Sequence, residues 1–162
     1  MSVKAGLPPI VRTDVRLLVL GSLPGDASLA ARQYYAHPSN QFWRLLGSAI
    51  DENLQDIDYE ARLACLAERR IGLWDVIASA SRRGSLDQAI RFAHPNLLNS
   101  RLCGLPDLQA IGFNGKTAAA VGRRLIKQRT DVSLIDLPSS SAANTKPFAE
   151  KASIWLGLGA FL

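Results

Sequence analysis

The sequence predicts an α/β fold, a three-layer α/β/α sandwich around a central, mostly parallel sheet of four strands. Short apolar runs, typical of buried strands, alternate with longer segments in which apolar residues recur at helical spacing. A chain of 162 residues that is 48% hydrophobic is long and apolar enough to bury one compact core. We find no internal repeat, linker or low-complexity segment, so residues 1–162 are interpreted as a single domain.

Four apolar runs are interpreted as the strands of this sheet. The first covers residues 15–20 (VRLLVL), and the others cover residues 71–77, 108–113 and 132–137. Each run ends in a polar or Gly-rich segment, in order GSLPG, the region of Asp75, FNG and LPSSS. Because ligands of open α/β sheets bind at the carboxyl ends of the strands, these segments are expected to converge on one crevice.

Helical segments are predicted between and after the strands. Ser39 or Asn40 is placed to act as the N-cap of the second of them. Residues 1–14 are expected to form an irregular N-terminal arm, because Pro8 and Pro9 prevent a helix there. The predicted helices cover residues 27–33, 41–50, 59–70, 86–92 and 116–128, and a last helix begins at Pro147.

The charge balance favours a polyanionic partner. Lys and Arg outnumber Asp and Glu by 19 to 14, which gives a formal charge of +5. Such an excess suits DNA, although many basic proteins bind no nucleic acid. No apolar run approaches the roughly 20 residues that a membrane span requires, and the N-terminus MSVKAGLPPIVR has no apolar signal core. We therefore expect a cytoplasmic protein without a membrane partner.

The cysteines and histidines give no sign of a metal site. Cys65 and Cys103 stand alone in apolar surroundings and are interpreted as buried small hydrophobic residues rather than as a disulfide. Two cysteines and two histidines provide no recognisable zinc or iron–sulfur spacing. Neither a metal nor a cluster is therefore expected.

Four segments carry recognisable motifs, in the order GSLPG with HPSNQFW (residues 21–43), GLWDVIASASRRGSLDQAI (72–90), IGFNGKTA (111–118) and LPSSSAAN (137–144). Together they resemble the uracil-DNA glycosylase superfamily, and most closely its hypoxanthine-DNA (DNA-deoxyinosine) glycosylase branch. GSLPG alone is a weak signal, but four segments in this order, spread over nearly the whole chain, are a strong one. The resemblance implies a monofunctional, monomeric enzyme. Such an enzyme flips a deaminated base, hypoxanthine, out of DNA and hydrolyses its N-glycosidic bond without metal or organic cofactor.

Asn40, in the segment HPSNQFW, is the catalytic residue that this resemblance implies. An amide cannot take up a proton at neutral pH, but its carbonyl oxygen can hold an attacking water. Cleavage of an N-glycosidic bond passes through an oxocarbenium-like sugar, so a positioned water and a stabilised leaving base can suffice. The alternative from the residues alone is an ordinary helix cap.

Two positions depart from other branches of the superfamily. Leu23 stands where the first motif usually offers an Asp or Asn to the water. Leu137 stands where the second motif of the classical uracil enzymes begins with His. Both departures place more of the catalysis on Asn40 and its neighbours, and they argue against efficient uracil excision.

The resemblance also implies a set of base-binding residues. Asn114, in FNG, is placed to read the flipped base with its amide donor and acceptor, or to serve as a turn residue before Gly115. Phe42 is expected to stack on the base, although it and Trp43 can divide stacking and core packing between them. The other candidates are Gln41, as a second amide or a solvent-facing side chain, Tyr35, as a pocket wall or a half-buried core residue, and Gly21 and Ser22 in the tight turn of GSLPG.

The segment from Pro138 to Asn144 resembles the second motif, whose serines grip the phosphates that flank the lesion. Ala142 would then lie at the tip that replaces the extruded base. By composition alone, the same segment is a solvated Ser-rich loop. The expected DNA contacts are Ser139, Ser140, Ser141, Ala142, Lys116 and Lys146, with Arg82 and Arg83 as further phosphate contacts.

The carboxylates expected nearest to the crevice are Asp75 and Asp26. Asp75 is interpreted as a turn or cap residue. Asp26 is the alternative candidate for activating the water. His37 could assist the leaving base or have a structural role.

Three other functions compete with this interpretation. One is a sister activity, the excision of uracil or of mispaired bases. A second is a DNA- or nucleotide-binding module that kept the fold and lost the chemistry. A third is an α/β enzyme that acts on a small phosphorylated molecule, for which DNA binding would depend only weakly on salt.

Overall fold

The computed structural model describes residues 2–162, and its centre is a parallel sheet of four strands in the order β3-β2-β6-β7. Each pair of neighbouring strands is parallel. The predicted four-stranded sheet is therefore confirmed. Its strands are β2 (Leu17–Gly21), β3 (Ile71–Asp75), β6 (Ala110–Asn114) and β7 (Ser133–Leu137).

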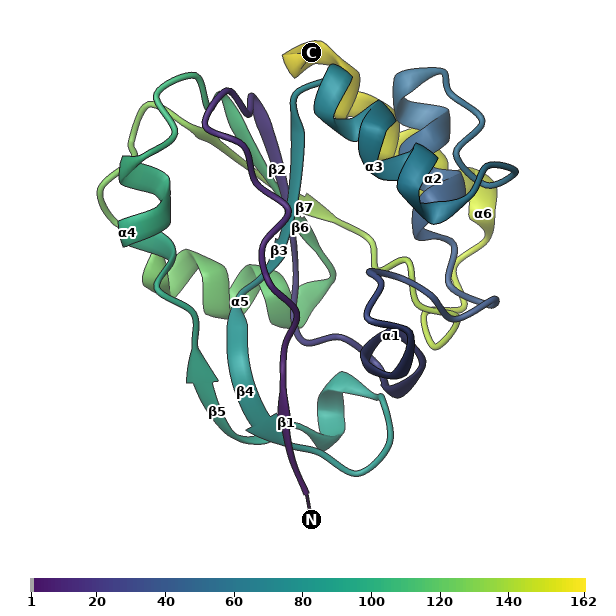
Figure 1. Cartoon of the computed structure of the whole chain (residues 1–162), viewed down its shortest axis with the longest axis vertical. Helices are drawn as coiled ribbons and strands as arrows, with labels where there is room; N and C mark the ends of the chain where they lie inside the picture. Colours follow the sequence, from purple (N-terminus) through teal and green to yellow (C-terminus); the bar gives the residue numbers. More distant parts are fainter. Residues whose placement is uncertain (1) are drawn as a thin grey trace.

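Helices cover both faces of this sheet, as the three-layer prediction requires (Figure 1). One face carries α2 (Phe42–Ile50), α3 (Tyr59–Glu68) and α6 (Phe148–Trp155), and the 3₁₀-helix η2 (Leu156–Phe161) follows α6. The other face carries α4 (Leu98–Cys103) and α5 (Lys116–Leu125). The short helix α1 (Asp26–Ala31) follows β2 beyond the end of the sheet.

The core consists of two apolar clusters, one on each face. Successive side chains of a strand point to opposite faces, and β2 shows this directly. Leu18 and Leu20 belong to the cluster under α4 and α5, whereas Leu17 and Val19 belong to the cluster under α2 and α6. All four side chains are buried, which explains why the run reads as continuously apolar.

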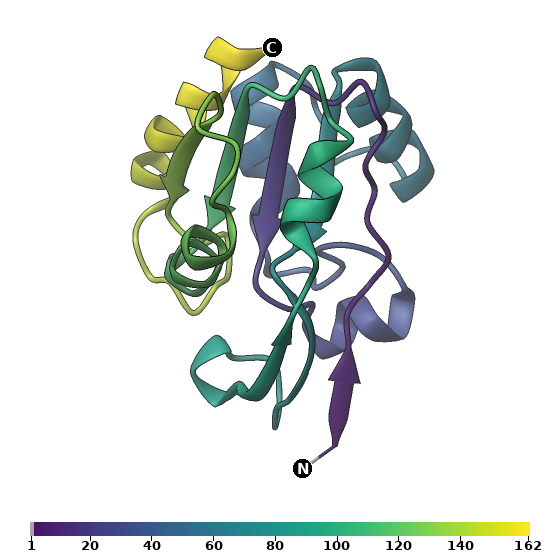
Figure 2. The same cartoon turned by 90° about the vertical axis from the view of Figure 1, so that its left-hand side faces the viewer.

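A second, smaller sheet extends beyond the carboxyl end of the main one (Figures 1 and 2). Its antiparallel strands are β1 (Val3–Ala5), β4 (Ile77–Ser81) and β5 (Arg91–Pro95), and the 3₁₀-helix η1 (Asp87–Ala89) lies between the last two. This sheet corrects three predictions. The arm over residues 1–14 contains a strand, the strand over 71–77 ends at Asp75, and the helix over 86–92 is a single 3₁₀ turn followed by a strand.

Buried arginine Arg82 connects the small sheet to the loop that follows β2. Its guanidinium donates to the backbone carbonyls of Leu23, Pro24 and Gly84. It is only 1% exposed, so the prediction that Arg82 contacts phosphate is wrong. The side chain instead joins the GSLPG loop, through Leu23 and Pro24, to the bend at Gly84 that follows β4, and it satisfies three backbone carbonyls.

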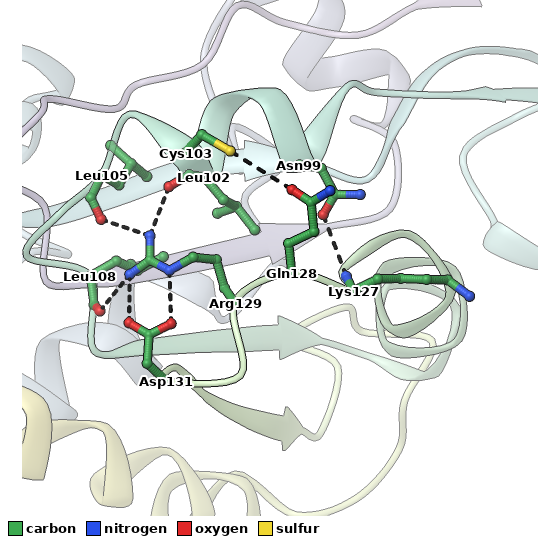
Figure 3. A network of polar contacts seen from close by, with 9 residues as sticks. All are labelled: Asn99, Leu102, Cys103, Leu105, Leu108, Lys127, Gln128, Arg129 and Asp131. Atoms are coloured by element: carbon green, nitrogen blue, oxygen red, sulfur yellow. Dashed lines mark hydrogen bonds and ion pairs between the residues drawn. The ribbon is translucent and has the colours of Figure 1, made fainter.

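A comparable network lies at the opposite end of the main sheet, where strands β6 and β7 begin (Figure 3). The Arg129 guanidinium donates to the carbonyls of Leu102, Leu105 and Leu108 and forms an ion pair with Asp131. It joins the loop after α4 to the loop after α5. This end of the sheet is remote from the strand ends at which ligands bind in such sheets.

Both cysteines are free thiols, as predicted, but they are not buried. Cys65 is half-buried, and Cys103 is exposed at the end of α4. Among the helices in residues 2–162, none combines the length and the apolar character needed to cross a membrane.

Candidate active site

The carboxyl ends of the four strands of the main sheet bring the predicted segments together. Gly21 pairs with Asp75 across β2 and β3, and Asn114 pairs with Leu137 across β6 and β7. The loops GSLPG and LPSSS therefore begin at the same edge of the sheet. The segments that were expected to converge therefore start from adjacent strand ends.

Tyr35, rather than Phe42, presents an aromatic ring at this edge. The two rings are stacked, with centroids 3.7 Å apart and planes 10° apart. Phe42 is fully buried, since Tyr35 covers one face and Trp43 and Trp155 pack edge-on against the ring. This corrects the expectation that Phe42 stacks on the base. Tyr35 is partly exposed and takes a left-handed backbone with φ of 54°, an uncommon conformation for a bulky residue that often marks a functional site.

Asn40 lies directly before α2 in a fixed orientation. Its Oδ1 accepts a hydrogen bond of 3.0 Å from the backbone N–H of Phe42, and its own N–H donates to the carbonyl of His37. The residue at the N-cap is Gln41, which makes no capping bond with its side chain. Asn40 thus binds the first turn of the helix, while one lone pair of Oδ1 stays available for a further donor.

The half-buried side chain of Gln41 is bonded within the protein, which neither expected role anticipated. Its Oε1 accepts a bond of 2.9 Å from Nζ of Lys151, a residue that is 1% exposed. Burial lowers the pKa of Lys151 below its ordinary value. Lys151 also donates to the carbonyl of Ser141, so this pair holds the start of α2 against the LPSSS loop.

Asn114 holds the same loop through a two-point contact with Ser140. The Asn114 Nδ2 donates to Ser140 Oγ, and the Ser140 N–H donates to Asn114 Oδ1, both at 2.9 Å. Ser140 is 1% exposed, so its hydroxyl cannot reach a phosphate, which corrects that expectation. The side chain of Asn114 also lies within reach of the Tyr35 hydroxyl, whose pKa it lowers against the larger effect of burial. One lone pair of its oxygen remains available to a further donor.

The other predicted DNA contacts lie on the surface around this loop. Ser139 and Ser141 are half-buried, and each hydroxyl accepts a backbone N–H two residues further along the chain. Ala142 is exposed at the tip of the loop. Lys116, at the start of α5, and Lys146 are exposed as well.

Asp75 lies deep at the edge, contrary to its interpretation as a turn or cap residue. It is 3% exposed, and within residues 2–162 its Oδ2 has no hydrogen-bond partner. Burial raises the pKa of Asp75 to about 7, and the carboxylate of Asp87 adds to the rise. The Tyr35 hydroxyl is a second buried group without a partner in the same part of the chain. Burial and then Asp75 raise the pKa of Tyr35 above its ordinary value.

Ser22 and Asp26 take part in contacts that shape the loop after β2. Ser22 Oγ donates to Asp87 Oδ1 at 2.6 Å, which joins the loop to η1. Asp26 is paired with Lys4 of β1 at 2.5 Å on the surface. His37 is exposed and accepts from the backbone of Ser39 within its own turn. None of these three contacts could be recognised from the sequence.

Gly21→Ala is expected to distort this edge. A Cβ at Gly21 would lie 2.7 Å from Asp75 Oδ1 and 2.8 Å from the Tyr35 hydroxyl, closer than side chains pack. Moving these groups should destabilise the fold by about 1–3 kcal/mol, which urea denaturation would measure. The matched control is Gly157→Ala, because a Cβ at Gly157 meets no atom within 4 Å. Equal stability of both variants would contradict the close approach.

Ser140→Ala should also destabilise the protein, by about 1–3 kcal/mol, because it leaves the buried Asn114 amide without its acceptor. Ser153→Ala is the control, since the Ser153 hydroxyl donates to the carbonyl of Glu150 on an exposed turn of α6. Thermal unfolding of the two variants checks this prediction. A Ser140→Ala variant as stable as Ser153→Ala would show that the hydrogen bond between Asn114 and Ser140 contributes nothing to stability.

Comparisons with known proteins agree with this geometry. The family model of the uracil DNA glycosylase superfamily matches residues 8–158. Two curated relatives, from Methanosarcina barkeri and Methanosarcina acetivorans, are each named hypoxanthine DNA glycosylase. They are 40% and 41% identical to this chain over 94% of its length, and the matches cover 95% and 96% of their own lengths.

A solved structure matches the fold over the whole chain. It is the solution NMR structure of "a putative Uracil DNA glycosylase" from Methanosarcina acetivorans, with a TM-score of 0.87, 39% identity and 99% coverage of both chains. The sheet order, the strand-end site and the motif segments all lie within the matched length. The chain belongs to the uracil DNA glycosylase superfamily.

Proposed function

We propose that this protein is a DNA glycosylase that removes hypoxanthine from DNA. The observation that carries the proposal is the extent of the match to two relatives named hypoxanthine DNA glycosylase, which includes every segment of the strand-end site. The basic charge of the chain supports a DNA substrate. We further propose that the enzyme acts as a monomer and that the reaction needs no metal ion.

The role proposed for Asn40 is to position the attacking water. The bond from the Phe42 N–H fixes the direction of Oδ1, so its free lone pair can accept a proton of a water held beside C1′ of the sugar. The water oxygen bonds to C1′ as the C1′–N9 bond breaks, and the electron pair of that bond stays with the base. The orientation reduces the entropy lost on reaching the transition state.

Tyr35 is proposed to stack on the extruded base. Phe42 stacks on one face of its ring, and Tyr35 as a residue is partly exposed. Aromatic stacking is worth about 1–3 kcal/mol per base and does not select among bases. Selection therefore depends on the polar groups at the strand ends, including the remaining acceptor of Asn114.

The DNA backbone is proposed to lie along the exposed serines and lysines beside the crevice. Ser139 and Ser141 offer polar groups in a tight turn, and Lys116 and Lys146 offer charge. Ala142 at the tip is proposed to take the place of the flipped base. Ser140 has no part in these contacts, because it is buried against Asn114.

A cleavage assay tests the proposed function. End-labelled duplexes with a single deoxyinosine or a single deoxyuridine are incubated with the protein and a chelator, and alkali reveals abasic sites. Strand breakage at inosine supports the proposal. Breakage mainly at uracil indicates the sister activity, and binding without breakage at either base indicates a binding module. DNA affinity that hardly falls with added salt contradicts a DNA substrate.

A further inference from the structure

Asp75 is a buried acid whose side chain is not fully hydrogen-bonded by the residues that the structure describes. Its backbone carbonyl accepts from Asn96 Nδ2, and its backbone pairs within the sheet, but Oδ2 of the side chain has no partner in residues 2–162. Buried polar groups are nearly always hydrogen-bonded, because an unpaired one costs about 1–3 kcal/mol. An unpaired carboxyl at a ligand-binding edge therefore points to a ligand.

The groups around Asp75 favour its neutral form. Asp87 faces it from η1, and the Tyr35 hydroxyl lies near Asp75 Oδ1 beside Gly21. The Tyr34 hydroxyl instead donates to the carbonyl of Pro8. Arg82 is the positive charge that opposes the rise in the pKa of Asp75. Its guanidinium donates to three backbone carbonyls, and within residues 2–162 no ion pair of Asp75 is found. A carboxyl desolvated in this way keeps its proton near neutral pH, consistent with its pKa of about 7.

A neutral carboxylic acid supplies what an amide cannot. Asn40 and Asn114 can hold water and base, but neither can transfer a proton at neutral pH. A purine that leaves from C1′ carries the electron pair of the broken bond and gains from protonation. Asp75 ends β3, next to Gly21 on β2 and beside the Tyr35 hydroxyl, so it lies at the edge proposed to receive the base.

We propose that Asp75 is the general acid of the reaction, which contacts the extruded purine and protonates it as it leaves. The inference rests on the proposed function. The C1′–N9 bond breaks with its electron pair on the purine, and the Asp75 proton moves to a purine nitrogen. The water held by Asn40 forms the new C1′–O bond, and the proton that it loses restores the Asp75 acid directly or through solvent. The products are an abasic sugar and neutral hypoxanthine, so one water is consumed and no net proton is exchanged.

Single-turnover excision of hypoxanthine, followed from about pH 5.5 to about pH 8.5, tests the inference. The wild-type rate should be level at low pH and fall above about pH 7, as Asp75 loses its proton. Asp75→Asn should be slower by about 10²-fold or more at low pH and show no such fall, with unchanged DNA affinity. Asp136→Asn is the matched control, because it removes an exposed carboxylate from β7 and should keep the wild-type profile.

A second variant tests the same acid without changing it. Asp87→Asn removes the carboxylate that helps to raise the pKa of Asp75. Its amide oxygen can still accept the bond from Ser22. The midpoint of the pH profile should therefore move to lower pH, while the rate on the low-pH plateau stays the same. An unmoved midpoint would overturn the assignment of the titrating group to Asp75.

Unfolding measurements test the proton on Asp75 without any catalysis. Because the native pKa lies above the ordinary value of 3.8, the folded protein binds this proton more tightly than the unfolded chain. The unfolding free energy of the wild type, relative to Asp75→Asn, should fall as pH rises from about 4 to about 7. If the stability difference between the two proteins does not change with pH, the inference that Asp75 is protonated in the folded protein is contradicted.

The outcomes separate the inference from the function on which it rests. If the wild type releases no hypoxanthine, both the proposed function and the role of Asp75 are contradicted. If the wild type releases hypoxanthine and the Asp75→Asn variant does so at the same rate, only the role of Asp75 as general acid is contradicted. A wild-type rate that rises with pH also overturns the inference, because the ionised carboxylate would then be the active form.

Discussion

Asn40→Ala is expected to slow hypoxanthine release by about 10²–10³-fold, which is the usual loss when one well-positioned group at a reacting centre is removed. The Asn40 amide is held by the bond from the Phe42 N–H, so the wild type places its oxygen before substrate arrives. Alanine removes both the oxygen and the bond. Single-turnover cleavage of an inosine duplex measures the loss.

The same substitution also removes a helix-terminal bond, which should cost about 1 kcal/mol of stability. Asn40→Asp separates the two effects, because its carboxylate can still accept from the Phe42 N–H while it changes the charge beside the sugar. Asn53→Ala is the matched control, since Asn53 lies on an exposed loop bonded to Asp56. An Asn40→Ala rate within about threefold of the wild type would contradict the role given to this residue.

The main sheet could be predicted because its strands are buried on both faces. The run at β2 is apolar at every position, and no helix-period pattern competes with it. The small sheet lacks that signal. Strand β5 (RFAHP) is exposed at all five positions, and β4 (IASAS) consists largely of small residues. Strand β4 pairs with β1, far away in sequence, and with β5 through an irregular register, and no local pattern reports either pairing.

The site was predicted in its backbone placement but not in its side-chain directions. The strand ends follow from the fold class, whereas the choice between Tyr35 and Phe42 depends on a left-handed backbone at Tyr35 that the sequence does not reveal. The burial of Lys151 and Arg82 is equally hidden, because such residues are almost always exposed. Asp75 directly after an apolar run has the pattern of a turn residue, and only the tertiary packing makes it a buried acid.

Trp155→Ala is expected to have the largest effect on stability, a loss of about 3–5 kcal/mol in the free energy of unfolding. Trp155 is fully buried, packs edge-on against Phe42 and donates from Nε1 to the carbonyl of Pro138 at 3.0 Å. Alanine therefore leaves a cavity under the ring that supports Tyr35, and it frees the start of the LPSSS loop. Urea denaturation measures the loss.

Trp155→Phe separates packing from the hydrogen bond in the same experiment. Phenylalanine keeps much of the ring contact with Phe42 but cannot donate to Pro138, so it should lose less stability than alanine does. If the carbonyl bond positions the loop, Trp155→Phe should weaken DNA binding although its core stays largely filled. A Trp155→Phe variant with wild-type affinity would show that packing alone holds the loop. An alanine variant that loses less than about 1 kcal/mol would contradict the placement of Trp155 in the core.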